Sequence, residues 1–68
     1  MKIVLEGGPL DGQRLEIEGD PASPPPVYVM SDPLKWPVTI RHYYTVTSVV
    51  RPWLDQTWGW VYKFDGSS

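Results

Sequence analysis

The dominant pattern along the chain is the alternation of apolar and polar residues, which predicts β-strands. Residues 2–7 are rich in aliphatic and β-branched side chains, a composition typical of a strand. Residues 13–18 alternate strictly, with Leu15 and Ile17 on one face and charged side chains on the other, as in a half-buried antiparallel strand. The intervening residues 8–12 contain a proline and two glycines, which favour a tight reversal. We therefore expect the first 18 residues to form a β-hairpin.

The rest of the chain holds three further strand candidates, of which residues 38–51 and 57–64 repeat this period-two pattern. The elements predicted there are a short strand at residues 27–30, a loop at 31–37, a long strand at 38–51, a turn at 53–56, a strand at 57–64 and a polar tail from 65 onward. At ~3.3 Å per residue the long strand would exceed ~40 Å if it were straight. We therefore expect a bend, a bulge or a turn near residues 45–48.

These segments predict an all-β fold: a small antiparallel meander or open barrel of four to five strands, with no substantial helix. A chain of 68 residues supports a single core, so we expect one domain over residues 1–66 and a frayed tail at residues 67–68. No apolar run approaches the ~20 residues that span a membrane, and Met1-Lys2 leads into only three apolar residues before Glu6, unlike a signal peptide. We expect no membrane partner.

Charge and residue counts exclude several classes of site. The formal net charge is −2, and the six basic residues are scattered singly, whereas nucleic-acid binders concentrate them in a patch. The chain has no cysteine and one histidine, so it lacks disulfides and offers too few ligands for a zinc site. We expect no nucleic acid, no metal and no cofactor.

Candidate catalytic residues are sparse. His42 lies in the middle of the long strand, and a triad with Ser48 could be drawn, but the glycine-rich turn that positions a nucleophilic serine is missing. A lone histidine in a strand is more typical of a core or surface residue. Residues 7–12 are glycine-rich but lack the lysine and the following helix of a phosphate-binding loop. We predict that the protein is not an enzyme and has no catalytic residues.

Aromatic residues are the most unusual feature of the composition, with four Trp, four Tyr and one Phe. One face of the last predicted strand carries four of them: Trp58, Trp60, Tyr62 and Phe64. We expect this face to pack against His42 and Tyr44 as cross-strand pairs and to form most of the core.

Other residues are candidates for contact with a partner protein. Residues 19–26 hold four of the eight prolines; they predict a stiff surface connection, or alternatively a PxxP-type ligand without the usual basic flanks. The two tryptophans in proline-bounded loops are either lids on the core or anchors in a partner's pocket, and both interpretations stay open. A rim of Arg41, Arg51 and Lys63 would add electrostatic register. The candidate protein-binding residues are Trp36, Trp53, Pro24, Pro25, Pro26, Arg41 and Arg51.

Both ends of the chain resemble a group of short proteins encoded by bacteriophages and prophages of actinobacteria. The matching residues near the start are Gly7, Gly8, Pro9, Asp11, Gly12 and Gln13, and those near the end are Trp60, Val61 and Tyr62. The centre of the chain is unmatched, and the shared motifs are turn and strand signals. The group has no agreed activity, so the resemblance transfers no residue role.

The resemblance implies a phage-type accessory protein that binds other proteins. Small β domains of this kind commonly decorate or stabilise a capsid, or serve as head–tail pieces, which would place the protein in the virion. The alternative is a phage protein in the host cytoplasm that inhibits or redirects a host protein. A chain this small also gains stability from a partner or from self-association, so a homo-oligomer is a further expectation.

Overall fold

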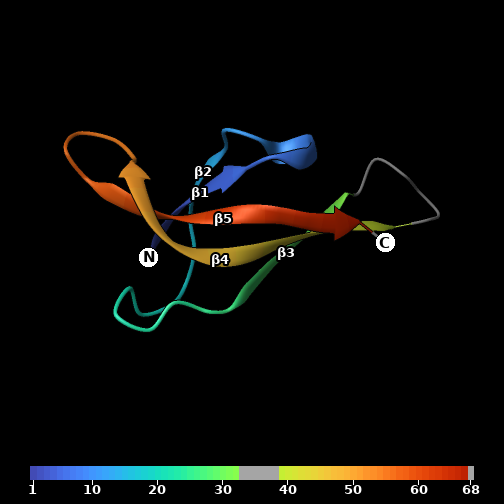
Figure 1. Ribbon diagram of the computed structural model, residues 1–68, viewed down its shortest axis with the longest axis horizontal. Helices are drawn as coiled ribbons and strands as arrows, with labels where there is room; N and C mark the ends of the chain where they lie inside the picture. The colour runs from blue at the N-terminus through green and yellow to red at the C-terminus, as the bar shows by residue number, and fades with distance from the viewer. Residues whose placement is uncertain (33–38, 68) are drawn as a thin grey trace.

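Five strands form one curled sheet in the computed structural model, which describes residues 1–32 and 39–67 (Figure 1). In chain order the elements are β1 (Lys2–Glu6), the 3₁₀ turn η1 (Gly8–Leu10), β2 (Arg14–Glu16), β3 (Val27–Asp32), β4 (Ile40–Pro52) and β5 (Trp58–Ser67). The strand order across the sheet is β2-β1-β5-β4-β3. The sheet closes only part of the way, as a half-barrel. The predicted all-β open barrel is thus confirmed.

One strand pairing differs from the expected antiparallel pattern. The pairs β1–β2, β4–β5 and β3–β4 are antiparallel, whereas β1 and β5 run parallel, with Ile3 opposite Trp60 and Glu6 opposite Lys63. The fold is therefore a hairpin and a three-stranded meander joined along β1 and β5. Side-chain alternation reports which face a residue occupies and carries no information about strand direction, so the parallel pair was not predictable from it.

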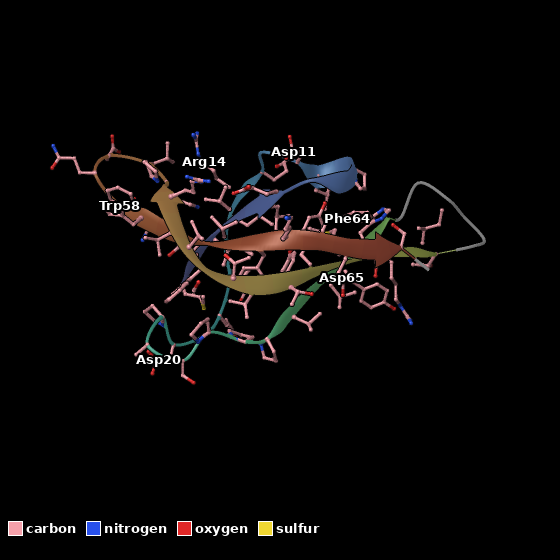
Figure 2. The ribbon with its side chains drawn as sticks, in the orientation of Figure 1. Asp11, Arg14, Asp20, Trp58, Phe64 and Asp65 are labelled. Carbon is pink, nitrogen blue, oxygen red and sulfur yellow. The ribbon has the colours of Figure 1, made fainter. Side chains whose placement is uncertain are left out.

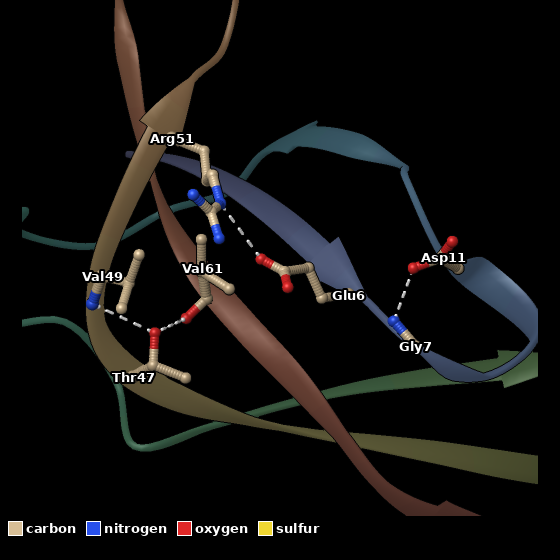
Figure 3. Close-up of polar contacts among 7 residues, drawn as sticks. All are labelled: Glu6, Gly7, Asp11, Thr47, Val49, Arg51 and Val61. Atoms are coloured by element: carbon tan, nitrogen blue, oxygen red, sulfur yellow. Dashed lines mark hydrogen bonds and ion pairs between the residues drawn. The ribbon is translucent and has the colours of Figure 1, made fainter.

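β4 bends where the sequence predicts it. Its pairing with β5 shifts register between Val46, opposite Tyr62, and Val50, opposite Trp60. The Thr47 hydroxyl lies in this gap, donating to the carbonyl of Val61 at 2.8 Å and accepting from the Val49 amide at 3.2 Å (Figure 3). A side chain thus substitutes for the interrupted backbone ladder, which lets β4 bend without leaving these groups unpaired.

Two strands are longer than expected. β3 continues from Val27 to Asp32, two residues beyond its predicted end at Met30. β5 continues through Ser67, so the expected polar tail from Asp65 belongs to the sheet. Ser67, at which the frayed tail was expected to begin, pairs with His42 of β4 and therefore belongs to the sheet.

The core is small and centres on β1. The fully buried side chains are Ile3, Leu5, Tyr44 and Tyr62, with Met1, Leu10, Leu15, Ile17, Tyr28, Val46, Trp60 and Phe64 packed around them. Val4 and Val61, which lie opposite each other in the β1–β5 register, are buried as well. β1 therefore buries consecutive residues that point to both faces, as expected of a central strand.

A glycine turn, residues 7–12, caps one end of this core through Tyr44. The Tyr44 hydroxyl donates to the carbonyl of Gly7 at 2.9 Å and accepts from the Leu10 amide at 3.1 Å. Gly8 has a φ of +66°, and a Cβ there would lie 2.4 Å from the Phe64 ring. The glycine-rich motif is therefore a structural element that packs against β4 and β5.

Candidate protein-binding surface

Among the described residues, the end of the β4–β5 hairpin carries the largest group of exposed apolar side chains. We call residues 49–58 the hairpin arm. It comprises the last residues of β4, the turn and the first residue of β5. Its exposed apolar side chains are Val49, Val50, Leu54 and Trp58, and Trp58 is the most exposed of them at 60%. Figure 1 shows the arm projecting at the end of the sheet, beyond the ribbon of β1.

A tight turn positions the tip of the arm. Asp55 and Gln56 both have positive φ, 47° and 68°, as do the central residues of a type I′ turn. The Thr57 amide donates to the Leu54 carbonyl at 2.8 Å, and the Trp53 amide donates to the Thr57 carbonyl at the same distance. The reversal leaves Leu54 exposed at the apex.

Trp53 is held against the sheet. Its indole N–H donates to the carbonyl of Ile3 at 3.2 Å, and the Lys2 ammonium lies 5.4 Å from the ring centroid. Gly59 lies beneath the ring, since a Cβ at that position would be 3.1 Å from the Trp53 Cδ1. Of the two interpretations of Trp53, the contacts favour the lid: the ring fastens the arm to β1.

Trp58 is the residue that the sequence pattern placed wrongly. It shares a face with Tyr62, which is buried, and with Trp60 and Phe64, which are half-buried, but it is exposed itself. Figure 2 shows Trp58 at the arm and Phe64 far along the same strand. The parallel pairing with β1 begins only at Trp60, so Trp58 has a paired strand on one side alone, at Pro52 of β4.

The proline segment is attached to the sheet by its carbonyl groups. Pro25 accepts from the Tyr62 hydroxyl at 2.5 Å, Pro26 accepts from the Val46 amide at 3.0 Å, and Pro21 accepts from the Trp60 indole at 2.9 Å. Pro24 and Pro25 are half-buried, and Pro26 is exposed. These contacts match a stiff surface connection better than a free PxxP ligand, which presents its rings and carbonyls to a partner.

The two candidate arginines lie far apart on β4. Arg51 is on the arm, with its Nε 3.4 Å from the Glu6 carboxylate (Figure 3). Beside this ion pair, an open groove of about 330 Å³ is lined in part by Arg14 and Asp11. Arg41 is exposed near the start of β4, opposite Ser31. The structure thus brings Arg51 and Trp53 together on the arm and places Arg41 elsewhere.

Trp36, the remaining candidate, lies outside the described residues. The sequence pattern did not predict the exposure of Val49, Val50, Leu54 or Trp58. A usable signal exists for the tip: Leu54 directly precedes the polar pair Asp55-Gln56 of the turn, and the first residue of a tight hairpin turn has little sheet to cover it.

The single histidine forms a pair that superficially resembles a catalytic dyad. Its Nδ1 is 2.7 Å from the Ser67 hydroxyl, whereas Ser48 lies in the irregular stretch of β4. Among the described residues, no hydrogen bond or ion pair joins the His42 ring to a carboxylate, and no group of three or more His, Asp or Glu side chains could hold a metal ion. No helix in residues 1–32 or 39–67 is long and apolar enough to cross a membrane.

Comparison with known proteins identifies the family of the chain without a function. No curated protein and no solved structure matches the sequence. A family described as a domain of unknown function (DUF8847) matches residues 1–66, which is nearly the whole chain of 68. The glycine turn, Tyr44 and the full core all lie within that match, and the protein therefore belongs to the DUF8847 family.

Proposed function

We propose that this domain is a non-enzymatic protein-binding module that docks on a partner protein through the hairpin arm. The observation that carries the proposal is the apolar arm itself, with Trp58 60% exposed and Leu54 52% exposed on a tight turn. Interface hot spots are enriched in tryptophan and lie in contiguous patches with a polar rim. Arg51, which also lies on the hairpin arm, supplies a polar group of this kind through its exposed guanidinium.

The construction of the arm also supports docking. Trp53 fastens the arm to β1 by its hydrogen bond to Ile3 and its contact with Gly59, so the arm is ordered before it meets a partner. An ordered surface loses less conformational entropy on binding than a flexible loop. A rigid apolar tip is therefore suited to insertion into a pocket of a larger protein.

The biological setting that we propose is a phage particle, as a capsid-decorating or head–tail accessory protein. The resemblance of the glycine turn and of residues 60–62 to phage and prophage proteins supports this setting. The mechanism would be cementing: a protein that binds only the assembled lattice stabilises it by mass action, without chemistry. The alternative partner is a host protein bound in the cytoplasm.

Particle analysis tests the setting. Particles of the phage that carries the gene are purified by gradient centrifugation and digested for mass spectrometry. A virion role requires this protein at a constant ratio to a structural protein of the particle. Its absence from the particles, together with a stoichiometric host partner in a pull-down from infected cells, would establish the host-directed alternative instead.

Variants test the arm. The full chain is added to particles assembled without it, and co-sedimentation is measured over a concentration series. Trp58→Ala should weaken binding by about 30-fold, the effect of losing a hot-spot residue worth about 2 kcal/mol. Glu18→Ala, at an exposed position outside the arm, is the control and should bind like the wild type. Equal binding by both variants would rule out the arm as the contact.

A further inference from the structure

The two edge strands of the sheet, β2 and β3, differ in how well they are protected against pairing with a further strand. β2, at one edge, has only three residues. The Ile17 amide donates to the Met1 carbonyl, and the Leu5 amide donates to the Gln13 carbonyl. Because alternate residues of a strand direct their backbone groups to opposite sides, those of Arg14 and Glu16 point away from β1. Short length and charged side chains are the usual defences of an edge strand. The short length and charged residues of β2 therefore disfavour the addition of a further strand at this edge.

β3, at the other edge, has neither defence. The Val46 amide donates to Pro26 at 3.0 Å, which sets the phase of the antiparallel β3–β4 ladder. Because the Pro26 carbonyl points toward β4 and successive residues alternate, the backbone N–H and C=O groups of Val27, Val29 and Ser31 point away from β4. Within residues 1–32 and 39–67, these outward groups have no hydrogen-bond partner.

The side chains at these outward positions suit strand pairing. Val27 is 46% exposed, Val29 is 44% exposed and Ser31 is exposed, and none of the three carries a charge. β-branched residues favour pairing between strands. An edge strand of six residues whose three outward positions are exposed and uncharged is the type of edge that adds a further strand.

We propose that β3 pairs antiparallel with β3 of a second copy of this chain, forming one continuous sheet across a two-fold axis at Val29. This symmetry places Val29 opposite Val29 of the second copy, and Val27 opposite Ser31. Each of these three pairs can exchange two backbone hydrogen bonds, about six in total. No charged side chain faces another across the axis at these positions.

A second copy fits this edge because the pairing is self-complementary. A two-fold interface brings the same patch of both subunits together, and the sequence of outward residues, Val27-Val29-Ser31, satisfies that requirement in the antiparallel direction. The domain also benefits from the added burial. Among the described residues only four side chains are fully buried, and domains of this size usually gain stability from a staple or an oligomer. The inference is independent of the proposed function, because the hairpin arm takes no part in it.

Analytical ultracentrifugation of the full chain over a concentration series tests the dimer. The monomer mass is 7.8 kDa, and we expect a reversible shift toward twice that mass as concentration rises. Val29→Lys places two ammonium groups opposite each other on the axis and should raise the dimer dissociation constant at least 100-fold. Val50→Lys is the matched control: Val50 is 45% exposed against 44% for Val29 and lies on the arm, so the dimer should be retained.

Amide hydrogen exchange locates the contact even if a variant is poorly folded. At high protein concentration the outward amides of Val29 and Ser31 should exchange at least tenfold more slowly than at low concentration. The inward amides of Tyr28 and Met30, which pair with β4, should be protected equally at both. A monomer at every concentration, or a dimer without concentration-dependent protection of the outward amides, would overturn the proposal.

Discussion

The glycine turn and the hairpin arm are both reversals between adjacent strands, yet the aromatic side chain at the first is buried and one at the second is exposed. At the glycine turn, the Tyr44 hydroxyl is paired twice, to Gly7 and Leu10. The Tyr44 ring lies 5.4 Å from that of Phe64. At the arm, Trp53 is fastened to β1, but Trp58 is left 60% exposed. The first reversal uses aromatic groups to close the core, and the second presents one to solvent.

This difference separates residues that maintain the fold from residues available for binding. A buried aromatic with satisfied polar groups contributes apolar burial and geometric specificity. An exposed tryptophan on an ordered hairpin contributes little to folding and is available to a partner. Stability and binding should therefore respond to different substitutions in the two regions, and four predictions test that separation.

The largest effect is expected at the glycine turn. Gly8→Ala should lower the free energy of unfolding by about 2–5 kcal/mol, because its φ of +66° is left-handed and the new Cβ would lie 2.4 Å from the Phe64 ring. Gly12→Ala is the matched control. Gly12 has a φ of +84° and open space around it, so that substitution should cost only about 1–2 kcal/mol. Chemical denaturation measures both, and equal losses would show that the turn does not pack against Phe64.

The next prediction compares two tryptophans of the same arm. Trp53→Ala should cost about 1–3 kcal/mol, because it removes the hydrogen bond to Ile3 and the ring packed on Gly59. Trp58→Ala should change stability by no more than about 0.5 kcal/mol. Thermal or urea unfolding followed by circular dichroism measures the difference. A loss at Trp58 as large as that at Trp53 would mean that Trp58 belongs to the core and not to a binding surface.

These contrasts also show which parts of the structure the sequence could predict. Alternation located β2, β4 and β5, apolar and β-branched composition located β1 and β3, and the length of β4 correctly predicted its bend near residues 45–48. Strand direction was not predictable, because Ile3, Val4 and Leu5 indicate a central strand but are equally compatible with a parallel or an antiparallel neighbour. The central position itself is visible in three consecutive apolar residues.

The binding surface was harder to predict than the fold. Alternation assigns Trp58 to the same face as Tyr62 but cannot tell where the covering strand stops. The role of Trp53 depends on its contact with Gly59, which is six positions later and reached only after the chain reverses. Long-range coverage, and not local pattern, decides whether an aromatic side chain of this protein is buried.

The third prediction concerns the pH dependence of the core. Burial raises the pKa of the Tyr62 hydroxyl above its ordinary value of 10.0, and the same hydroxyl donates to Pro25. Tyr62 therefore binds its proton more tightly in the folded chain than in the unfolded chain. Its contribution to stability is complete below about pH 10 and is lost as the pH rises through the raised folded-state pKa.

Urea denaturation at pH 7, 10 and 11 measures this dependence. Tyr62→Phe should be less stable than the wild type at pH 7 by about 0.5–1.5 kcal/mol, because the hydrogen bond to Pro25 is lost. The variant should also show a smaller loss of stability between pH 10 and 11. Trp58→Ala, a substitution in the exposed region, should retain the alkaline loss of the wild type. An identical alkaline decline in wild type and Tyr62→Phe would contradict the assignment.

The smallest effect is expected at the tip of the arm, and it is a gain. Gln56 has a φ of 68°, which is uncommon for a residue other than Gly, Asn or Asp. Gln56→Gly relieves this strain and should raise the free energy of unfolding by up to about 1 kcal/mol, since part of the gain is offset by the larger entropy of glycine in the unfolded chain. Asp55→Gly at the neighbouring position, with a φ of 47°, should gain less because Asp tolerates this conformation better. A loss of stability in Gln56→Gly would show that the Gln56 side chain itself supports the arm. A gain with unchanged partner binding would show that the Gln56 side chain makes no contact with the partner, as expected if the turn only holds Leu54 and Trp58 in place.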